Sequence, residues 1–191
     1  RLSAVFDVDK RPWIQPENTP STDALAETIQ YCPTGALHFN RKDGGAQEQT
    51  PEENTIRLVP DGPLYVRGDV KVVDSQGEVI AEDTRMALCR CGASNNKPFC
   101  DNTHKDVLFK DSGTPAEHPD SDPNVSGARQ LRIEATHNGP LVLSGEFEII
   151  GADGQTVFLG NDTALCRCGG SSNKPFCDDT HRVIGFVSDE A

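Results

Sequence analysis

Basic residues are scarce in this chain of 191 residues. It has 18 lysines and arginines against 30 aspartates and glutamates, which gives a formal net charge of −12 at pH 7. Nucleic acids and anionic membranes are bound through basic patches, so neither is expected as the main partner. The acidic surface is either simply solvated or forms a face that docks a basic redox partner. Nothing in the sequence locates such a face.

Long hydrophobic runs are also missing. No apolar stretch approaches the roughly 20 residues needed to span a bilayer, and no signal-peptide pattern is present. The seven cysteines are an odd number, which fits poorly with a closed disulfide framework. We therefore expect a soluble protein of a reducing compartment, the cytoplasm.

Apolar and aromatic side chains are too few for a large core. Hydrophobic residues make up 35% of the chain and aromatic residues 6%, while 17 glycines and 13 prolines favour turns and loops. A unit of half this length can bury only a thin core. Such a unit needs a further source of stability, and a bound metal centre is the expected one.

The chain does contain a cysteine-rich motif that occurs twice. The copies occupy residues 89–104 and 166–181, at an offset of 77 residues, and both have the spacing C-x-C-x8-C-x3-H. Six of the seven cysteines therefore fall into two matched sets. Aligned without gaps, residues 62–109 and 139–186 are identical at 21 of 48 positions. The chain is thus an internal duplication.

The residue types of the motif are those of a metal centre. Thiolates are soft ligands that suit iron-sulfur chemistry, and C-x-C puts two of them on one metal with little loop entropy to lose. Zinc is the structural rival, because three cysteines and one histidine are a common tetrahedral zinc set, although zinc sites usually contain C-x2-4-C pairs. The candidate ligands are Cys89, Cys91, Cys100 and His104 in the first copy, and Cys166, Cys168, Cys177 and His181 in the second.

Both copies resemble the CDGSH iron-sulfur (mitoNEET-like) family, whose signature is C-x-C-x2-[S/T]-x3-P-x-C-D-G-[S/A/T]-H. Every defined position but one is met: the glycine is replaced by Asn102 and Asp179. If that position needs a positive φ, Asn and Asp are the least costly substitutes. The resemblance implies two [2Fe-2S] clusters, one in each motif, held by three cysteines and one histidine, with the solvent-facing iron on the histidine.

Further residues of the motifs are expected beside the ligands. The two aspartates that follow the third cysteines can cap a short helix whose first turn carries the histidine, or accept a hydrogen bond that tunes the cluster. The arginines at positions 90 and 167 either neutralise cluster charge or are simply exposed. The predicted neighbours of the ligands are Ser94, Asp101, Ser171 and Asp178.

Residues 2–40 resemble the C-terminal half of the divergent [4Fe-4S] ferredoxin domain that accompanies CDGSH motifs in some bacterial proteins. Ser21 or Thr19 can cap a helix that runs to about Tyr31, and Cys32 followed by Pro33 resembles the last ligand of a bacterial ferredoxin run. The other three cysteines would lie upstream of the first residue. One thiolate cannot hold a cubane cluster, so we expect Cys32 to be an unliganded buried thiol. The alternative is a site completed by residues outside this sequence.

The expected fold class is α+β and rich in strands. Apolar residues alternate in both repeats around turns at 60–63 and 74–77, and at 137–140 and 153–154. We predict a partial ferredoxin-like segment with a linker at 1–50, CDGSH domains at 54–110 and 129–191, and a linker at 111–128. The two motifs are expected to form a pseudo-two-fold pair within a monomer, with a β cap and a cluster-binding region. Alternatively, each repeat pairs with another chain.

The expected function is electron transfer between two clusters and an outside redox partner. We see no Ser-His-Asp arrangement, P-loop or paired carboxylates, so we do not expect an enzyme. One alternative is a labile [2Fe-2S] donor to an apo-acceptor protein, or a redox or pH sensor, because protonation of a histidine ligand competes with iron. The other is a zinc-stabilised interaction module.

Overall fold

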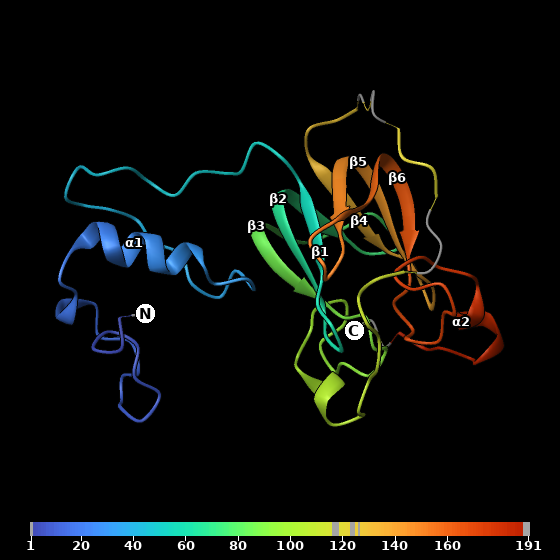
Figure 1. Cartoon of the computed structure of the whole chain (residues 1–191), viewed down its shortest axis with the longest axis horizontal. Helices are drawn as coiled ribbons and strands as arrows, with labels where there is room; N and C mark the ends of the chain where they lie inside the picture. Colours follow the sequence, from blue (N-terminus) through green and yellow to red (C-terminus); the bar gives the residue numbers. More distant parts are fainter. Residues whose placement is uncertain (1, 116–118, 123–124, 126, 189–191) are drawn as a thin grey trace. The chain divides into compact units, whose positions relative to one another are not determined.

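The computed structural model describes residues 2–115, 119–122, 125 and 127–188. The chain divides into two compact units, residues 1–49 and 50–191, and each is described by itself (Figure 1). The predicted linker at 111–128 lies partly outside the described residues, as do the first residue of the predicted segment 1–50 and the last three of the predicted domain 129–191.

Within residues 2–49, the first unit contains one α-helix and little other regular structure. The 3-10 helix η1 (Pro16–Asn18) precedes α1 (Thr22–Gln30), and the Oγ of Ser21 accepts a hydrogen bond from the amide of Ala24 at 3.1 Å. The predicted cap is therefore confirmed. Arg41 forms ion pairs with Asp23 in the first turn of α1 and, at 2.7 Å, with Asp43, so it fastens the end of the unit to the helix.

The described residues of the second unit contain six strands, and the last three repeat the first three. They are β1 (Thr55–Leu58), β2 (Leu64–Val73), β3 (Val79–Leu88), β4 (Leu131–Ala135), β5 (Leu141–Ile150) and β6 (Thr156–Leu165). Within each repeat the three strands form an antiparallel meander. The α+β, strand-rich class is thus confirmed.

The two repeats also exchange strand pairings. Strand β1 pairs in parallel with β5, and β2 pairs in parallel with β4. Since β1 also pairs with β2 and β4 with β5, the four strands close into a ring, with β3 and β6 added outside. The pseudo-two-fold pair predicted within one chain is therefore present. The strands of each repeat pair with the other repeat of the same chain, not with another chain as in the alternative.

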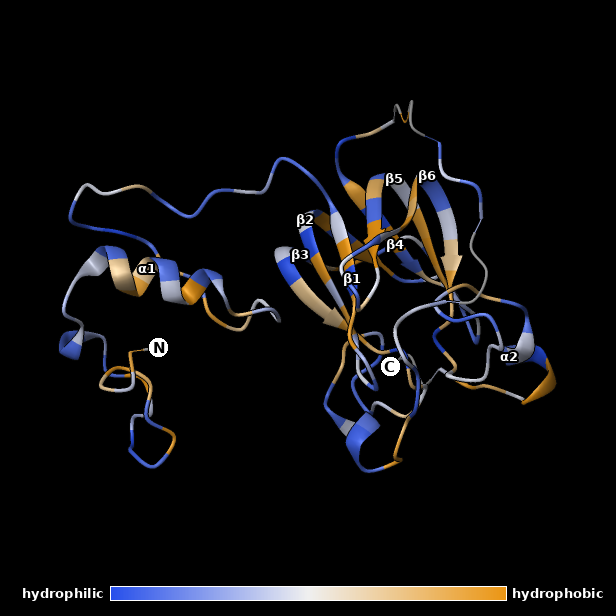
Figure 2. Ribbon diagram, viewed as in Figure 1, coloured by the Kyte–Doolittle hydropathy of each residue, from blue (hydrophilic) through white to orange (hydrophobic). Residues whose placement is uncertain are grey.

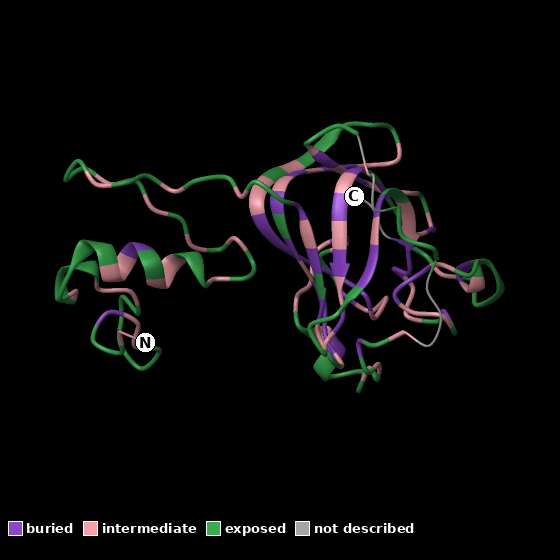
Figure 3. Ribbon diagram, turned by 45° about the horizontal axis from the view of Figure 1, so that its top comes forward, coloured by how far each residue is buried: buried purple, intermediate pink, exposed green. Residues whose placement is uncertain are grey.

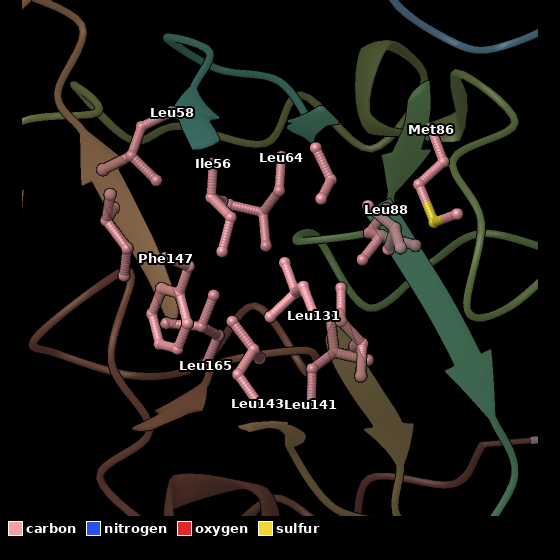
Figure 4. Packing of buried hydrophobic residues seen from close by; sticks show 14 of the residues in the cluster. Ile56, Leu58, Leu64, Met86, Leu88, Leu131, Leu141, Leu143, Phe147 and Leu165 are labelled. Atoms are coloured by element: carbon pink, nitrogen blue, oxygen red, sulfur yellow. The ribbon is translucent and has the colours of Figure 1, made fainter. Parts of the chain in front are cut away.

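Alternating side chains of the ring fill one shared core. Along β5 every second residue is buried, in the order Leu141, Leu143, Gly145, Phe147 and Ile149. Residues from both repeats meet inside the ring, as Figure 4 shows for Ile56, Leu64, Leu131 and Leu141. The apolar and buried positions coincide along the strands (Figures 2 and 3). The core that each repeat lacks alone is built from both.

A buried asparagine joins the repeats where the long strands bend. The side-chain amide of Asn54 donates to the carbonyls of Arg129 (2.6 Å) and Glu146 (2.8 Å), and its oxygen accepts from the amide of Asp69 (2.9 Å). Gly68 stands at the register shift of β2, where a Cβ would lie 2.0 Å from Asn54 Oδ1. A side chain at this position would displace the asparagine that links the repeats.

Candidate metal centres

The predicted ligands lie in two loops that continue the outer strands. Both loops leave the same end of the sheet, below β3 and β6 in Figure 1. The amide of Cys89 donates to the carbonyl of Pro98 at 2.8 Å, and the amide of Cys100 donates to the carbonyl of Ala87 at 2.9 Å. The same two bonds recur from Cys166 and Cys177 at 2.7 and 2.9 Å. Each loop is therefore a hairpin that places its first and third cysteines on facing arms.

The four donors of each motif lie in two close pairs. In the first motif, the sulfurs of Cys89 and Cys91 are 3.7 Å apart, and the sulfur of Cys100 is 3.4 Å from Nδ1 of His104. The second motif has the same arrangement, with distances of 3.7 Å for the thiol pair and 3.5 Å for the thiol–imidazole pair. The structure thus brings the predicted ligands together two by two.

These distances fit two tetrahedral metals per motif better than one. With metal–sulfur bonds of about 2.3 Å and metal–nitrogen bonds of about 2.0 Å, neighbouring ligands lie roughly 3.5 to 3.8 Å apart. A single ion would need all four donors at such separations. Within the described part of the chain, the one trio of potential ligands whose donor atoms lie within 4.8 Å of one another is Cys177, Asp179 and His181. The thiol pairs therefore stand apart from the thiol–imidazole pairs, as a binuclear centre requires.

The surroundings of the first motif shift the pKa values of all four candidate ligands. The hydrogen bond with Cys91 lowers the pKa of Cys89 to about 6, while it raises the pKa of Cys91. Burial lowers the pKa of His104 and raises that of Cys100. A thiolate and a neutral imidazole are the metal-binding forms of these groups. The shifts at Cys89 and His104 therefore favour metal binding, whereas those at Cys91 and Cys100 favour the protonated thiol.

The two histidine side chains are buried. His104 is 8% exposed and His181 is 7% exposed. Both rings turn Nδ1 toward a cysteine sulfur. In the second motif, Nε2 of His181 lies 3.8 Å from a carboxylate oxygen of Asp179.

The predicted serine and aspartate neighbours shape the loops. The Oγ of Ser94 donates to the carbonyl of Phe99 and accepts from the amide of Asn96, and Ser171 makes the matching bonds. Asp101 accepts from the amides of Thr103 and Asn95, at 2.9 and 2.8 Å, and these bonds lower its pKa. Asp178 has the same role, and its pKa is also lowered by its hydrogen bonds. These four residues hold the backbone that carries the ligands.

The short helices that carry the histidines begin one residue later than expected. The first is η2 (Thr103–Lys105) and the second α2 (Thr180–Val183), and their N-cap residues are Asn102 and Asp179 rather than the preceding aspartates. Asn102 has a φ of 74° and Asp179 a φ of 64°. The positive φ expected at the substituted glycine position is therefore confirmed. Asp101 and Asp178 precede the N-cap residues, and each accepts a hydrogen bond from the first amide of its helix.

The arginines between the first two cysteines are buried, so the expectation of plain exposure is wrong. Arg90 donates from Nε to the carbonyl of Gly62 at 3.1 Å and from Nη2 to that of Val59 at 2.6 Å, and it pairs with Asp111. Its guanidinium lies 5.4 Å from the ring centre of Phe109. Arg167 repeats the contacts with Gly139, Thr136 and Phe186. Each arginine thus fastens a ligand loop to the turn before the first long strand of its repeat.

Two glycines that sequence reasoning did not single out hold the ligand loops against each other. A Cβ on Gly92 would lie 2.3 Å from the carbonyl oxygen of Cys168, and one on Gly169 would lie 2.4 Å from that of Cys91. Both glycines have a positive φ, 80° and 78°. Glycine stands at this position in both repeats, and this match is the sequence signal that could have identified the two residues. The two candidate centres are consequently neighbours.

Cys32 lies in the first unit and is half-buried, so the expectation of a buried thiol is only partly met. Its sulfur lies 3.4 Å from the hydroxyl of Thr34. Burial acts to raise the pKa of this thiol, but hydrogen bonds with Thr34, Leu37 and Ala36 outweigh burial and lower it.

Comparisons with known families match both parts of the chain. The family described as iron-binding zinc finger, CDGSH type, matches residues 61–105 and 138–182, which contain all eight candidate ligands. The family described as divergent 4Fe-4S mono-cluster matches residues 1–42. A search of curated proteins returned no match to the chain.

Neither α1 nor α2 could cross a membrane. Within the described ranges, no helix combines the necessary length with sufficient apolar character.

Proposed function

Because this chain belongs to the CDGSH iron-binding family through both of its repeats and carries a divergent 4Fe-4S segment before them, we propose that it is an electron-transfer protein with two [2Fe-2S] clusters. Cluster 1 is held by Cys89, Cys91, Cys100 and His104. Cluster 2 is held by Cys166, Cys168, Cys177 and His181. The outside partner is a redox protein of a reducing compartment such as the cytoplasm, the chain acts as a monomer, and it has no catalytic reaction of its own.

The paired donors suggest how each cluster is divided between its ligands. The two thiolates of C-x-C hold one iron, and the third cysteine and the histidine hold the other. A [2Fe-2S] centre supplies one-electron chemistry. Backbone amides also point at the ligand sulfurs: those of Ala93 and Asn102 donate to Cys91 and Cys100 at 3.5 and 3.4 Å. Hydrogen bonds to cluster sulfurs help to set a reduction potential.

The contact between the two ligand loops is the main observation in support of an electron-transfer function. Gly92 abuts the backbone of Cys168, and Gly169 abuts that of Cys91. Neighbouring one-electron centres can share an electron, whereas a zinc-stabilised interaction module gains nothing from this arrangement. The separation of the donors into pairs further disfavours a single zinc ion.

The histidine ligand favours a second candidate, the release of a labile cluster to an apo-acceptor or a response to pH. An imidazole must lose its proton at the ligating nitrogen to bind iron, so acid competes with the metal. The burial of both imidazoles slows this release, and for that reason we place electron transfer first.

Visible absorption and metal content test the proposal. The purified chain should be coloured at neutral pH, contain iron and sulfide at about four irons per chain (two for each binuclear site), and bleach on reduction by dithionite with recovery in air. Reversible reduction without transfer of iron to an apo-ferredoxin supports electron transfer, and rapid transfer supports the donor function. A colourless protein with one zinc per motif contradicts both.

A further inference from the structure

The two motifs differ in charge at one position whose side chain faces a candidate ligand in the second motif. Asn102 and Asp179 occupy the same place in the repeats, both in the left-handed region with φ values of 74° and 64°. Asp179 is a carboxylate, and Asn102 is its uncharged near-isostere. The chain therefore contains a natural comparison of one charge at one site.

The carboxylate of Asp179 faces the outer nitrogen of its ligand. Its Oδ1 lies 3.8 Å from Nε2 of His181, while Nδ1 of the same ring faces the sulfur of Cys177 at 3.5 Å. A separation of 3.8 Å is too long for a hydrogen bond but short enough for a charge interaction, which solvent weakens because the Asp179 side chain is 66% exposed. The imidazole thus stands between a metal position and a fixed negative charge.

The other charged side chains near the two histidines are matched between the motifs, except for Asp106. Arg182 and Lys105 hold the same position, and Arg182 reaches Asp179 at 3.4 Å through a side chain that is 75% exposed. Such an exposed pair is well screened by solvent. Asp101 and Asp178 are common to both motifs. Asp106 has no acidic counterpart in the second motif, and its negative charge acts on the imidazole of His104.

We propose that Asp179 makes the two clusters unequal, so that cluster 1 accepts the first electron and cluster 2 has the lower reduction potential. This inference rests on the proposed function. Reduction transfers one electron from an external one-electron donor to a ferric ion and makes the site one unit more negative. The carboxylate beside His181 opposes that added charge, and Asn102 beside the first histidine does not. Asp179 is a positioning residue that acts on the cluster through the imidazole.

A potentiometric titration of the full chain, followed by visible absorption and electron paramagnetic resonance, tests this inference. The wild-type chain should show two one-electron waves. A preference of about tenfold for reducing cluster 1 corresponds to a separation of about 59 mV for one-electron couples. Asp179→Asn should raise only the lower wave, and Asn102→Asp should lower only the upper wave. The double exchange should restore two separate waves, with the order of the clusters reversed.

Two further variants serve as checks. Asp179→Gly removes the same carboxylate, suits the positive φ, and should shift the lower wave in the same direction as Asp179→Asn. Asp153→Asn removes one charge in the turn between β5 and β6, a ten-residue strand away from Cys166, and should move neither wave. This control separates a local effect from the loss of one unit of net charge.

The possible results separate this inference from the proposed function. Two clusters that titrate together, or an Asp179→Asn variant that leaves both waves in place or shifts them equally, overturn the inference and leave the electron-transfer function intact. A chain without redox-active iron overturns both.

Discussion

The guanidinium of Arg90 is a buried charge with its partners in place. Arg90 is 1% exposed. Its guanidinium donates hydrogen bonds to two carbonyl oxygens, forms an ion pair with Asp111 and lies over the ring of Phe109. Removing one partner of a buried ion pair leaves the other charge without compensation. The stability of the ligand loop should therefore depend on this side chain.

Replacing Arg90 with Met should lower the free energy of unfolding by about 3–5 kcal/mol, because the carboxylate of Asp111 and two carbonyls lose their donor. Urea denaturation of the chain measures the change. Lys110→Met is the control: its ion pair with Asp61 is 2.7 Å long, but the lysine side chain is 78% exposed. That change should be within about 1 kcal/mol. Equal effects of the two substitutions would contradict the structural role of Arg90.

Acid should remove the first cluster through His104. Burial lowers the pKa of this imidazole from its ordinary value of 6.5, so the neutral, metal-binding form persists to lower pH than in an exposed histidine. The visible absorption should therefore be stable at pH 7 and decay only as the pH falls below about 6.5. His104→Cys should slow the decay at pH 5, as followed by absorbance over time.

His38→Gln is the matched control for this experiment, because His38 lies in the first unit and pairs with Glu48 at 3.0 Å. It should leave the decay unchanged. A His104→Cys variant that decays as fast as the wild type would show that this histidine is not a ligand.

The contact between the ligand loops gives a test with a built-in comparison. Gly92 and Gly77 both have a positive φ, 80° and 88°, but a Cβ on Gly77 would meet nothing within 4 Å. Gly77→Ala should therefore cost only the backbone strain, about 1–2 kcal/mol. Gly92→Ala should cost roughly 1–3 kcal/mol more, since its Cβ collides with the backbone of Cys168.

Thermal or urea unfolding compares the two glycine variants, and the iron content of Gly92→Ala reports on both centres. Because the collision lies between the loops, one substitution should reduce the occupancy of cluster 1 and cluster 2 together. Equal destabilisation by the two variants would mean that the loops can separate at little cost.

The strands and turns follow from local sequence patterns, but the arrangement of the ligand loops does not. Alternation of apolar residues around the Asp74–Gly77 turn predicts the hairpin that the structure contains, because one face of each strand must be buried. The spacing of cysteines and histidine likewise identifies the candidate ligands. The burial of Arg90 and the contact at Gly92 depend on segments 19 or more residues away. No local pattern records these partners.

The ring of four strands makes each repeat dependent on the other. Strand β1 of the first repeat pairs with β5 of the second, and β4 of the second repeat pairs with β2 of the first. Neither repeat therefore has a closed sheet of its own. The hydrophobic cluster also draws on both repeats. The pattern of one repeat predicts its meander, but the choice of a partner within the same chain depends on the fused second copy, which pattern analysis could only suggest.

A chain limited to residues 50–115 should therefore fold only as a dimer that copies these pairings. Its stability should rise with protein concentration, since association and folding are linked. Sedimentation equilibrium and circular dichroism over a range of concentrations measure both. Residues 50–191 form the control, and their unfolding midpoint should not depend on concentration. A folded monomer of the single repeat would contradict the shared core.

The closed ring also decides where this molecule could recruit further strands. Among the described residues, four of the six strands have both edges occupied, and the outer edges belong to β3 and β6. The edge of β6 is partly covered, because Ser121 and Asp122 hydrogen-bond to Leu159. Unpaired edges are templates for aggregation, and charged side chains blunt them. Strand β3 carries Glu82 and Asp83, and β6 carries Asp162. With a net charge of −12, edge-to-edge growth into fibres would bring like charges together, so the acidic composition protects the sheet from polymerising.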